Sequence, residues 1–147
     1  MKLELPRCRQ NAEFLRHYNL ACSSYQHQIE ILRSAVGWNP LTGKYQTVLE
    51  GSFAHYSITD PQELIAFARI ISDGAIYALI VDVMVHPAFQ SRGLGSRFVK
   101  HILEDLKLEN IRNVNVIFDA KLERFYESLG FEFLKAGTIK TLLKNLD

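Results

Sequence analysis

Residues 85–96 read Val-His-Pro-Ala-Phe-Gln-Ser-Arg-Gly-Leu-Gly-Ser, and they join an apolar segment to a segment with helical periodicity. Glycines in such a loop let the backbone turn with N–H groups that no Cβ atom obstructs. The first N–H groups of a helix lack intrahelical acceptors and lie at the positive end of the helix dipole. This arrangement binds phosphate oxygens, so the loop is a candidate phosphate site. The alternative is a connection in which glycine only permits a tight turn.

Two common phosphate-binding motifs do not fit this loop. A dinucleotide-binding fingerprint, Gly-x-Gly-x-x-Gly, needs a third glycine where Phe98 stands. A Walker loop needs Gly-Lys-Ser/Thr, which the segment lacks. Both of these motifs are therefore rejected for this loop.

Two side chains that precede the loop could accept a proton. Asp82 interrupts an otherwise apolar strand, where an unpartnered carboxylate is costly to bury. Asp82 therefore either pairs with an arginine or a nearby loop, or faces an acceptor cleft and helps to deprotonate an amine. A lysine-like amine has a pKa of about 10.4 and needs such help at neutral pH. His86 is the commoner type of base, but its place before Pro87 is typical of an exposed residue.

Strands and helices must position these groups, and hydrophobic periodicity predicts where they lie. Strands are expected at residues 13–20, 52–58, 63–71, 75–85 and 114–118, the last buried on both faces, with a closing hairpin over 131–134 and 138–143. Asp73-Gly74 predicts a two-residue type I′ turn between the third and fourth strands.

Four helices are predicted between these strands. The first follows a capping box formed by Ser23 and Gln26 and stops at Gly37, and the second spans residues 42–50. The third spans residues 94–109, with an apolar stripe of Leu94, Phe98, Ile102 and Leu106. The fourth carries Leu122, Phe125, Tyr126 and Leu129 and ends at Gly130. This order predicts an α/β fold with one mixed, mainly antiparallel sheet flanked by helices.

Length and composition favour one ordinary globular domain over residues 1–147, with residues 1–12 as a possible extension. The chain is 48% hydrophobic and 22% charged, and its net charge of +1 gives no bulk attraction to nucleic acid or to a membrane surface. Cys8 and Cys22 form neither a disulfide framework nor a metal-binding pair, so no metal is expected. Without a signal peptide or a membrane-length apolar run, a cytoplasmic location is expected.

Two motifs, taken together, resemble the GNAT superfamily of acyl-CoA-dependent N-acetyltransferases. The family's strand–loop–helix signature is Val-x-Pro-x-x-Gln/Arg-x-x-Gly-x-Gly/Ala, which Val85, Pro87, Gln90, Gly93 and Gly95 match. A second motif, Phe-Tyr-x-x-Leu-Gly-Phe, is similar to residues 125–131. The resemblance covers residues 64–133 well and the first half only by the order of its elements.

The resemblance implies acetyl-CoA as co-substrate and a GNAT-like fold. In this family the loop amides bind the pyrophosphate of coenzyme A, and the preceding strand offers backbone groups to the pantetheine arm and the thioester carbonyl. The implied cofactor-binding residues are Val83, Met84 and Val85 in the strand and Gln90, Ser91, Arg92, Gly93, Leu94, Gly95 and Ser96 in the loop.

Three further residues enter through the same resemblance. Tyr126 is implied as the acid that protonates the departing thiolate; the alternative is a core aromatic residue. Asp119 stands where many members have an asparagine that contacts the cofactor, and a carboxylate there cannot donate the same hydrogen bond. Trp38 lies in the region that covers the acceptor in the family, so Trp38 and Asp82 are candidate substrate-binding residues.

The expected function is direct transfer of an acetyl group from acetyl-CoA to a primary amine of a small molecule. Tyr126 and Asp82 are the candidate catalytic residues, and no acyl-enzyme is expected because no serine or cysteine has a recognisable base. One alternative is a protein or peptide acetyltransferase that acts on lysine or an N-terminus, and another is a non-catalytic acyl-CoA sensor. The assembly is expected to be a monomer or a homodimer.

Overall fold

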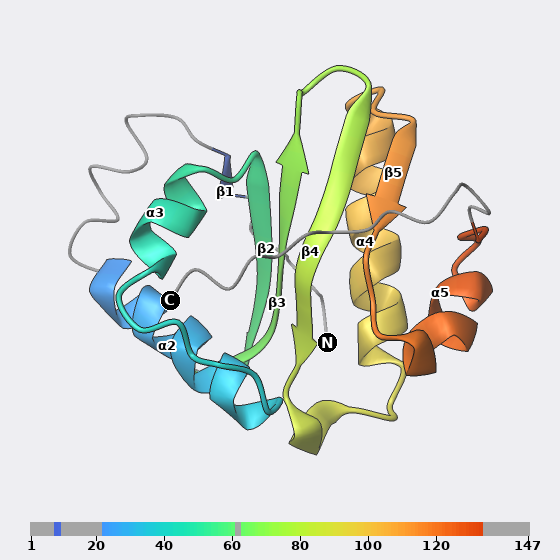
Figure 1. Cartoon of the computed structure of the whole chain (residues 1–147). Coiled ribbons are helices and arrows are strands. Elements are labelled where there is room, and N and C mark those ends of the chain that lie inside the picture. Colours follow the sequence, from blue (N-terminus) through green and yellow to red (C-terminus); the bar gives the residue numbers. More distant parts are fainter. Residues whose placement is uncertain (1–7, 10–21, 61–62, 134–147) are drawn as a thin grey trace, which may run out of the picture.

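A five-stranded sheet forms the centre of the protein (Figure 1). The computed structural model describes residues 8–9, 22–60 and 63–133. Neighbouring strands follow the sequence order: β1 (Cys8–Arg9), β2 (Ala54–Asp60), β3 (Glu63–Ser72), β4 (Tyr77–Val85) and β5 (Asn113–Val116). The first four strands are antiparallel, and β5 runs parallel to β4. The predicted mixed, mainly antiparallel sheet is confirmed.

Helices cover the two faces of this sheet. Helices α2 (Cys22–Ala35) and α3 (Tyr45–Glu50) lie on one face, α4 (Leu94–Leu108) lies on the other, and α5 (Glu123–Ser128) lies beside β5 (Figure 1). Two short 3-10 helices, η1 (Pro87–Phe89) and η2 (Ala120–Leu122), precede α4 and α5. The predicted stop after α2 is confirmed, because Gly37 has a φ of +84° and the next amide bonds back to the carbonyl of Arg33.

Each face of the sheet has its own apolar core. The predicted stripe of α4 is confirmed: all four of its members are buried against the sheet, where they meet residues such as Tyr56, Ile70 and Ile80. On the opposite face Ile29 and Leu32 of α2 pack with Tyr45, Phe67 and Met84. Burial of side chains of this size stabilises the fold by about 1.5–3 kcal/mol each, so both faces hold their helices firmly.

The hairpin between β3 and β4 exists, but the predicted type I′ turn is wrong. Gly74 has a positive φ and Asp73 does not, and the loop spans residues 73–76. The Asp73 carboxylate accepts hydrogen bonds from the amides of Ala75, Ile76 and Tyr77 at 2.9, 2.8 and 3.1 Å. These side-chain bonds stabilise a wider loop than two residues would form.

Several other boundaries differ from the prediction. Strand β5 is shorter than expected, and its residues alternate between exposed and half-buried, so the expected burial on both faces is wrong. Ser23 lies inside α2, which begins at Cys22, and not at its N-cap. Residues 131–133 are not a strand. The predicted strand over residues 13–20 and the second arm of the closing hairpin lie outside the described residues.

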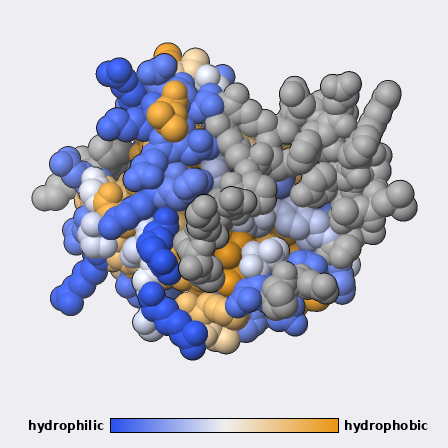
Figure 2. All heavy atoms as spheres, turned by 180° about the vertical axis from the view of Figure 1, so that it is seen from behind, coloured by the Kyte–Doolittle hydropathy of each residue, from blue (hydrophilic) through white to orange (hydrophobic). Residues whose placement is uncertain are grey.

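Hydrophilic residues cover most of the described surface seen from behind, with hydrophobic residues in smaller areas at the top and low on this face (Figure 2). Within the described ranges, no helix is both long and apolar enough to cross a membrane.

Candidate active site

The loop between β4 and α4 is held by its own side chains. His86 accepts a hydrogen bond from the Ala88 amide at 3.1 Å and so caps η1. Gln90 reaches back and donates from Nε2 to the carbonyl of Val85 at 2.8 Å. These bonds fix the exit of the chain from β4 before the loop turns into α4. His86 is therefore a local cap, and Gln90 anchors the loop to the strand that precedes it.

Two left-handed residues then turn the backbone into the helix. Ser91 has a φ of +61° and Gly93, the N-cap of α4, a φ of +76°. The backbone N–H groups of residues 91–96 have no hydrogen-bond acceptor among the described residues. A continuous row of free amides at the start of a fifteen-residue helix can bind an anion. The predicted phosphate-binding residues thus come together in one loop whose amides are free to act.

Strand β4 contains an irregularity directly before this loop. Asp82 has a φ of +55°, and the pairing of β4 with β3 shifts there. The parallel pairing with β5 extends only from Tyr77 to Ile80 on β4. From Val81 onward the β5 side of β4 therefore has no strand partner in the described part of the chain. Val83, Met84 and Val85 lie in this unpaired stretch, where an extended ligand could add to the strand edge.

Tyr126 lies in α5 and is 3% exposed. Its ring stacks on Phe118 at 4.6 Å between centroids and meets Phe125 and Phe131 edge-on. Burial raises the pKa of the Tyr126 hydroxyl above its usual value of about 10, so the group stays protonated at neutral pH. No described residue forms a hydrogen bond with this hydroxyl. A buried polar group without a partner is uncommon in a core and is typical of a functional site.

Asp119 caps the turn that leads to α5. Its Oδ1 accepts a hydrogen bond from the Lys121 amide at 3.1 Å, and its Oδ2 lies 3.5 Å from Lys121 Nζ. The amide bond and the lysine charge lower the pKa of the exposed Asp119 carboxyl, which is ionised at neutral pH. Its own turn thus satisfies this side chain, and its contact with the cofactor stays a prediction.

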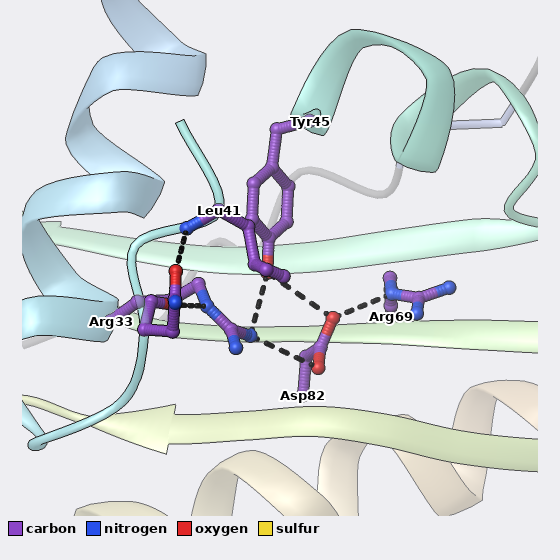
Figure 3. A network of polar contacts seen from close by, with 6 residues as sticks. Arg33, Leu41, Tyr45, Arg69 and Asp82 are labelled. Carbon is purple, nitrogen blue, oxygen red and sulfur yellow. Dashed lines mark hydrogen bonds and ion pairs between the residues drawn. The ribbon is translucent and has the colours of Figure 1, made fainter. Parts of the chain in front are cut away.

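Asp82 joins four elements of the fold in one polar network (Figure 3). Its Oδ2 accepts from Arg69 Nε in β3 at 2.6 Å, and its Oδ1 accepts from Arg33 Nη1 in α2 at 3.4 Å. Tyr45 of α3 accepts from Arg33 at 3.0 Å and donates to Asp82 at 3.3 Å. Burial, and then the Asp82 charge, raise the pKa of the Tyr45 hydroxyl. Of the two alternatives for Asp82, these contacts favour pairing with arginine, and its role as a base stays a prediction.

Arg33 also holds the loop between α2 and α3. Its Nε donates to the carbonyl of Asn39 at 2.6 Å, and its guanidinium lies 5.2 Å from the centroid of the Trp38 ring, a cation–π distance. Trp38 is 42% exposed, next to Leu41 at 38%. Arg33 thus connects Trp38 with Asp82, and the role of Trp38 in acceptor binding stays a prediction.

Arg33, Tyr45 and Arg69 were missed by the sequence analysis. The sequence does contain a sign that Arg69 and Asp82 pair. Arg69 is the lone cation in the mainly apolar strand Glu63–Ser72, and Asp82 is the lone anion in the next strand. The predicted turn between β3 and β4 gives a strand register that keeps Arg69 and Asp82 apart, because a two-residue turn places Arg69 opposite Ala78. In the structure Arg69 is opposite Val81, adjacent to Asp82.

A hollow of about 820 Å³ is lined by β5, α5 and residues 130–133. It includes Tyr126 but no residue of the loop and no member of the Asp82 network. In the part of the chain that the structure describes, no group of three His, Cys, Asp or Glu side chains is arranged to hold a metal ion.

Comparisons with known proteins find relatives by sequence and by fold. The family model of the GNAT acetyltransferase domain matches residues 51–133. An uncharacterized N-acetyltransferase ycf52 of Gracilaria tenuistipitata var. liui is 37% identical over 111 residues, which cover 71% of this chain and 60% of the relative. A Glycine max protein named histone acetyltransferase TAP1 is 31% identical over 119 residues, 72% of this chain and 51% of the relative.

A solved structure of a predicted acetyltransferase with acetyl-CoA from Clostridium acetobutylicum has the same fold. Its TM-score is 0.66 at 13% identity, with 97% of this chain and 99% of that chain covered. The chain belongs to the GNAT acetyltransferase family, which confirms the resemblance. It spans between about half and three-fifths of the length of the two relatives above.

Proposed function

We propose that the protein transfers an acetyl group from acetyl-CoA directly to a primary amine of a small molecule. The observation that carries this proposal is a row of six backbone amides, residues 91–96, at the start of α4. They have no acceptor among the described residues, and they follow the end of β4 that no described strand pairs. Membership of the GNAT family supplies the activity class.

The residues present fit coenzyme A. Amides 91–96 would hold its pyrophosphate, with the exposed Arg92 adding positive charge. The free edge of β4 at Val83, Met84 and Val85 would pair with the pantetheine arm. When bound, acetyl-CoA supplies an activated thioester, and a backbone N–H of this edge would stabilise the oxyanion that forms on its carbonyl.

The transfer needs one bond to form and one to break. The neutral amine nitrogen attacks the acetyl carbonyl carbon, the carbon–sulfur bond breaks, and the nitrogen loses a proton to solvent or to a base. The thiolate takes a proton from the Tyr126 hydroxyl, which recovers one from water. The Tyr126 hydroxyl is buried and protonated, and no described residue bonds it, which supports this assignment.

Asp82 is the predicted base, and Asp82 and Trp38 are the predicted acceptor-binding residues. Asp82 is bonded to two arginines, and a carboxylate held by two such contacts is suited to position the acceptor region. Replacement of Asp82 by asparagine separates a positioning role from a role as base, because asparagine cannot accept the proton.

The experiment that tests the function is acetyl-CoA turnover, read as free thiol, against a panel of amines. Acetylation of a small amine by the native chain and its loss in Tyr126→Phe would support the proposal. Acetyl-CoA binding without turnover of any amine or peptide would contradict it and favour a sensor.

A second candidate function is acetylation of lysine or of an N-terminus in a protein. The similarity to a relative named as a histone acetyltransferase favours it. Peptides added to the same panel decide between the two. A cytoplasmic location and a monomeric or homodimeric state stay predictions.

A further inference from the structure

The Asp82 network carries more positive than negative charge. Two guanidiniums, Arg33 and Arg69, share the single carboxylate of Asp82, and Tyr45 stays neutral because its pKa is raised. His55, the cross-strand neighbour of Arg69, is also neutral, because burial lowers its pKa to about 4. No other described carboxylate pairs with either guanidinium. The cluster therefore carries a net charge of +1 in a partly buried setting.

The hydrogen-bonding capacity of the two arginines differs. Arg33 uses Nε on Asn39 and Nη1 on Tyr45 and Asp82. Arg69 uses only Nε, and within the described ranges its two terminal nitrogens have no acceptor although its side chain is only 19% exposed. Figure 3 shows these nitrogens turned away from Asp82. A guanidinium with free terminal nitrogens is suited to bind a planar carboxylate through two parallel hydrogen bonds.

The position of Arg69 relates this capacity to the proposed reaction. Arg69 lies opposite Val81, so it is one strand away from the free edge of β4 that would hold the thioester. Its bond to Asp82, which also bonds Arg33 of α2 and Tyr45 of α3, places Arg69 on the sheet face that these helices cover. A cation beside the acceptor would also lower the pKa of an amine and so increase its nucleophilic neutral fraction.

We propose that Arg69 is a specificity-determining residue that binds a carboxylate on the acceptor, so that the substrate class is a small amine that also carries a carboxylate. This inference rests on the proposed function, whose acceptor it specifies. The surplus positive charge disfavours the alternative of a lysine-rich tail, because like charges would meet at the site.

The test compares matched pairs of amines that differ only in the carboxylate: phenylalanine with phenethylamine, and 6-aminohexanoate with hexylamine. The two members of a pair differ in amine pKa, so the informative quantity is how a variant changes their ratio of kcat/KM. We expect Arg69→Gln to lower the carboxylate-to-amine ratio of at least one pair tenfold or more. Arg69→Lys keeps the charge beside Asp82 but not the two-pronged geometry, and should lower the ratio less.

Arg124→Gln is the matched control, because Arg124 is an exposed arginine that does not line the hollow beside Tyr126, and it should leave the ratio unchanged. A ratio that Arg69→Gln leaves unchanged, because both members fall equally, would overturn the inference and assign Arg69 a structural role alone. If no amine is acetylated, the proposed function fails. Calorimetric binding of phenylalanine and phenethylamine in the presence of coenzyme A then tests Arg69 separately. The inference is overturned if the native protein does not bind phenylalanine. It is also overturned if Arg69→Gln binds phenylalanine as tightly as the native protein does.

Discussion

The proposed coenzyme side of the site, which comprises loop 90–96 and α4, is assembled from neighbours in the sequence. The proposed acceptor side, beneath α2 and α3, joins distant residues. Gln90 bonds a carbonyl five positions away. Asp82 bonds Arg33 and Tyr45, which are 49 and 37 positions away. A local structure is specified by a short motif, so it can be recognised from sequence and transferred between proteins. The acceptor side depends on single residues that only the complete fold brings together.

The largest expected effect is on the chemistry that uses both sides. Tyr126→Phe removes the hydroxyl and keeps the ring stacked on Phe118. We expect kcat to fall about 10²-fold to 10⁴-fold, because a general acid is lost, with little change in acetyl-CoA affinity. Steady-state kinetics and calorimetry measure the two quantities. An unchanged kcat with lower stability would return Tyr126 to the role of a core residue.

Replacing the central anion of the acceptor side should mainly reduce stability. Asp82→Asn leaves Arg33 and Arg69 without their counter-ion in a partly buried site, and we expect a loss of about 3 kcal/mol in the free energy of unfolding. Urea denaturation measures this loss. If Asp82 is instead a base, the variant should keep its stability and lose kcat/KM for the amine, with partial recovery at high pH, where the amine supplies its own neutral form.

The acceptor side should also make folding sensitive to acid. His55 bonds Tyr25 and stacks on Phe67, and burial lowers its pKa to about 4, from about 6.5 in the unfolded chain. The unfolded state therefore binds the proton first, and stability should fall by about 2–3 kcal/mol as the pH drops from 6.5 to 4. His55→Gln, which does not titrate, should lose less over this interval. Equal pH dependence of the two proteins would contradict a buried neutral His55.

The smallest effect is expected on the coenzyme side and concerns Gly95. A Cβ at this position would lie 3.6 Å from Phe125 and 3.7 Å from Val85, which are ordinary contacts, so Gly95→Ala should fold with undiminished stability. Gly95→Asp adds a negative charge beside the free amides, and we expect coenzyme A to bind about tenfold more weakly, or about 1.4 kcal/mol. Calorimetry on both variants makes the comparison, and equal affinity for coenzyme A would place its pyrophosphate elsewhere.

The amino-acid sequence by itself determined the class of the fold, and within residues 22–128 the order of its helices and strands. It also predicted the coenzyme side. The stripe of α4 follows from helical spacing, and the loop follows from two glycines and the helix start that Gly93 caps. Backbone geometry of this kind depends on near neighbours, and for that reason it can be predicted without coordinates.

Only the tertiary structure decided the partners of Asp82 and the register that creates them. The Asp-Gly dipeptide predicts a turn of two residues, but hydrogen bonds to the Asp73 carboxylate stabilise a wider one. The strand register that goes with the wider turn places Arg69 beside Asp82. Arg33 and Tyr45 reach the same carboxylate because α2 and α3 pack on that face of the sheet. The interaction between two charges depends on the distance between them in space. For residues that are far apart in the sequence, this distance cannot be read from the pattern of residues along the chain.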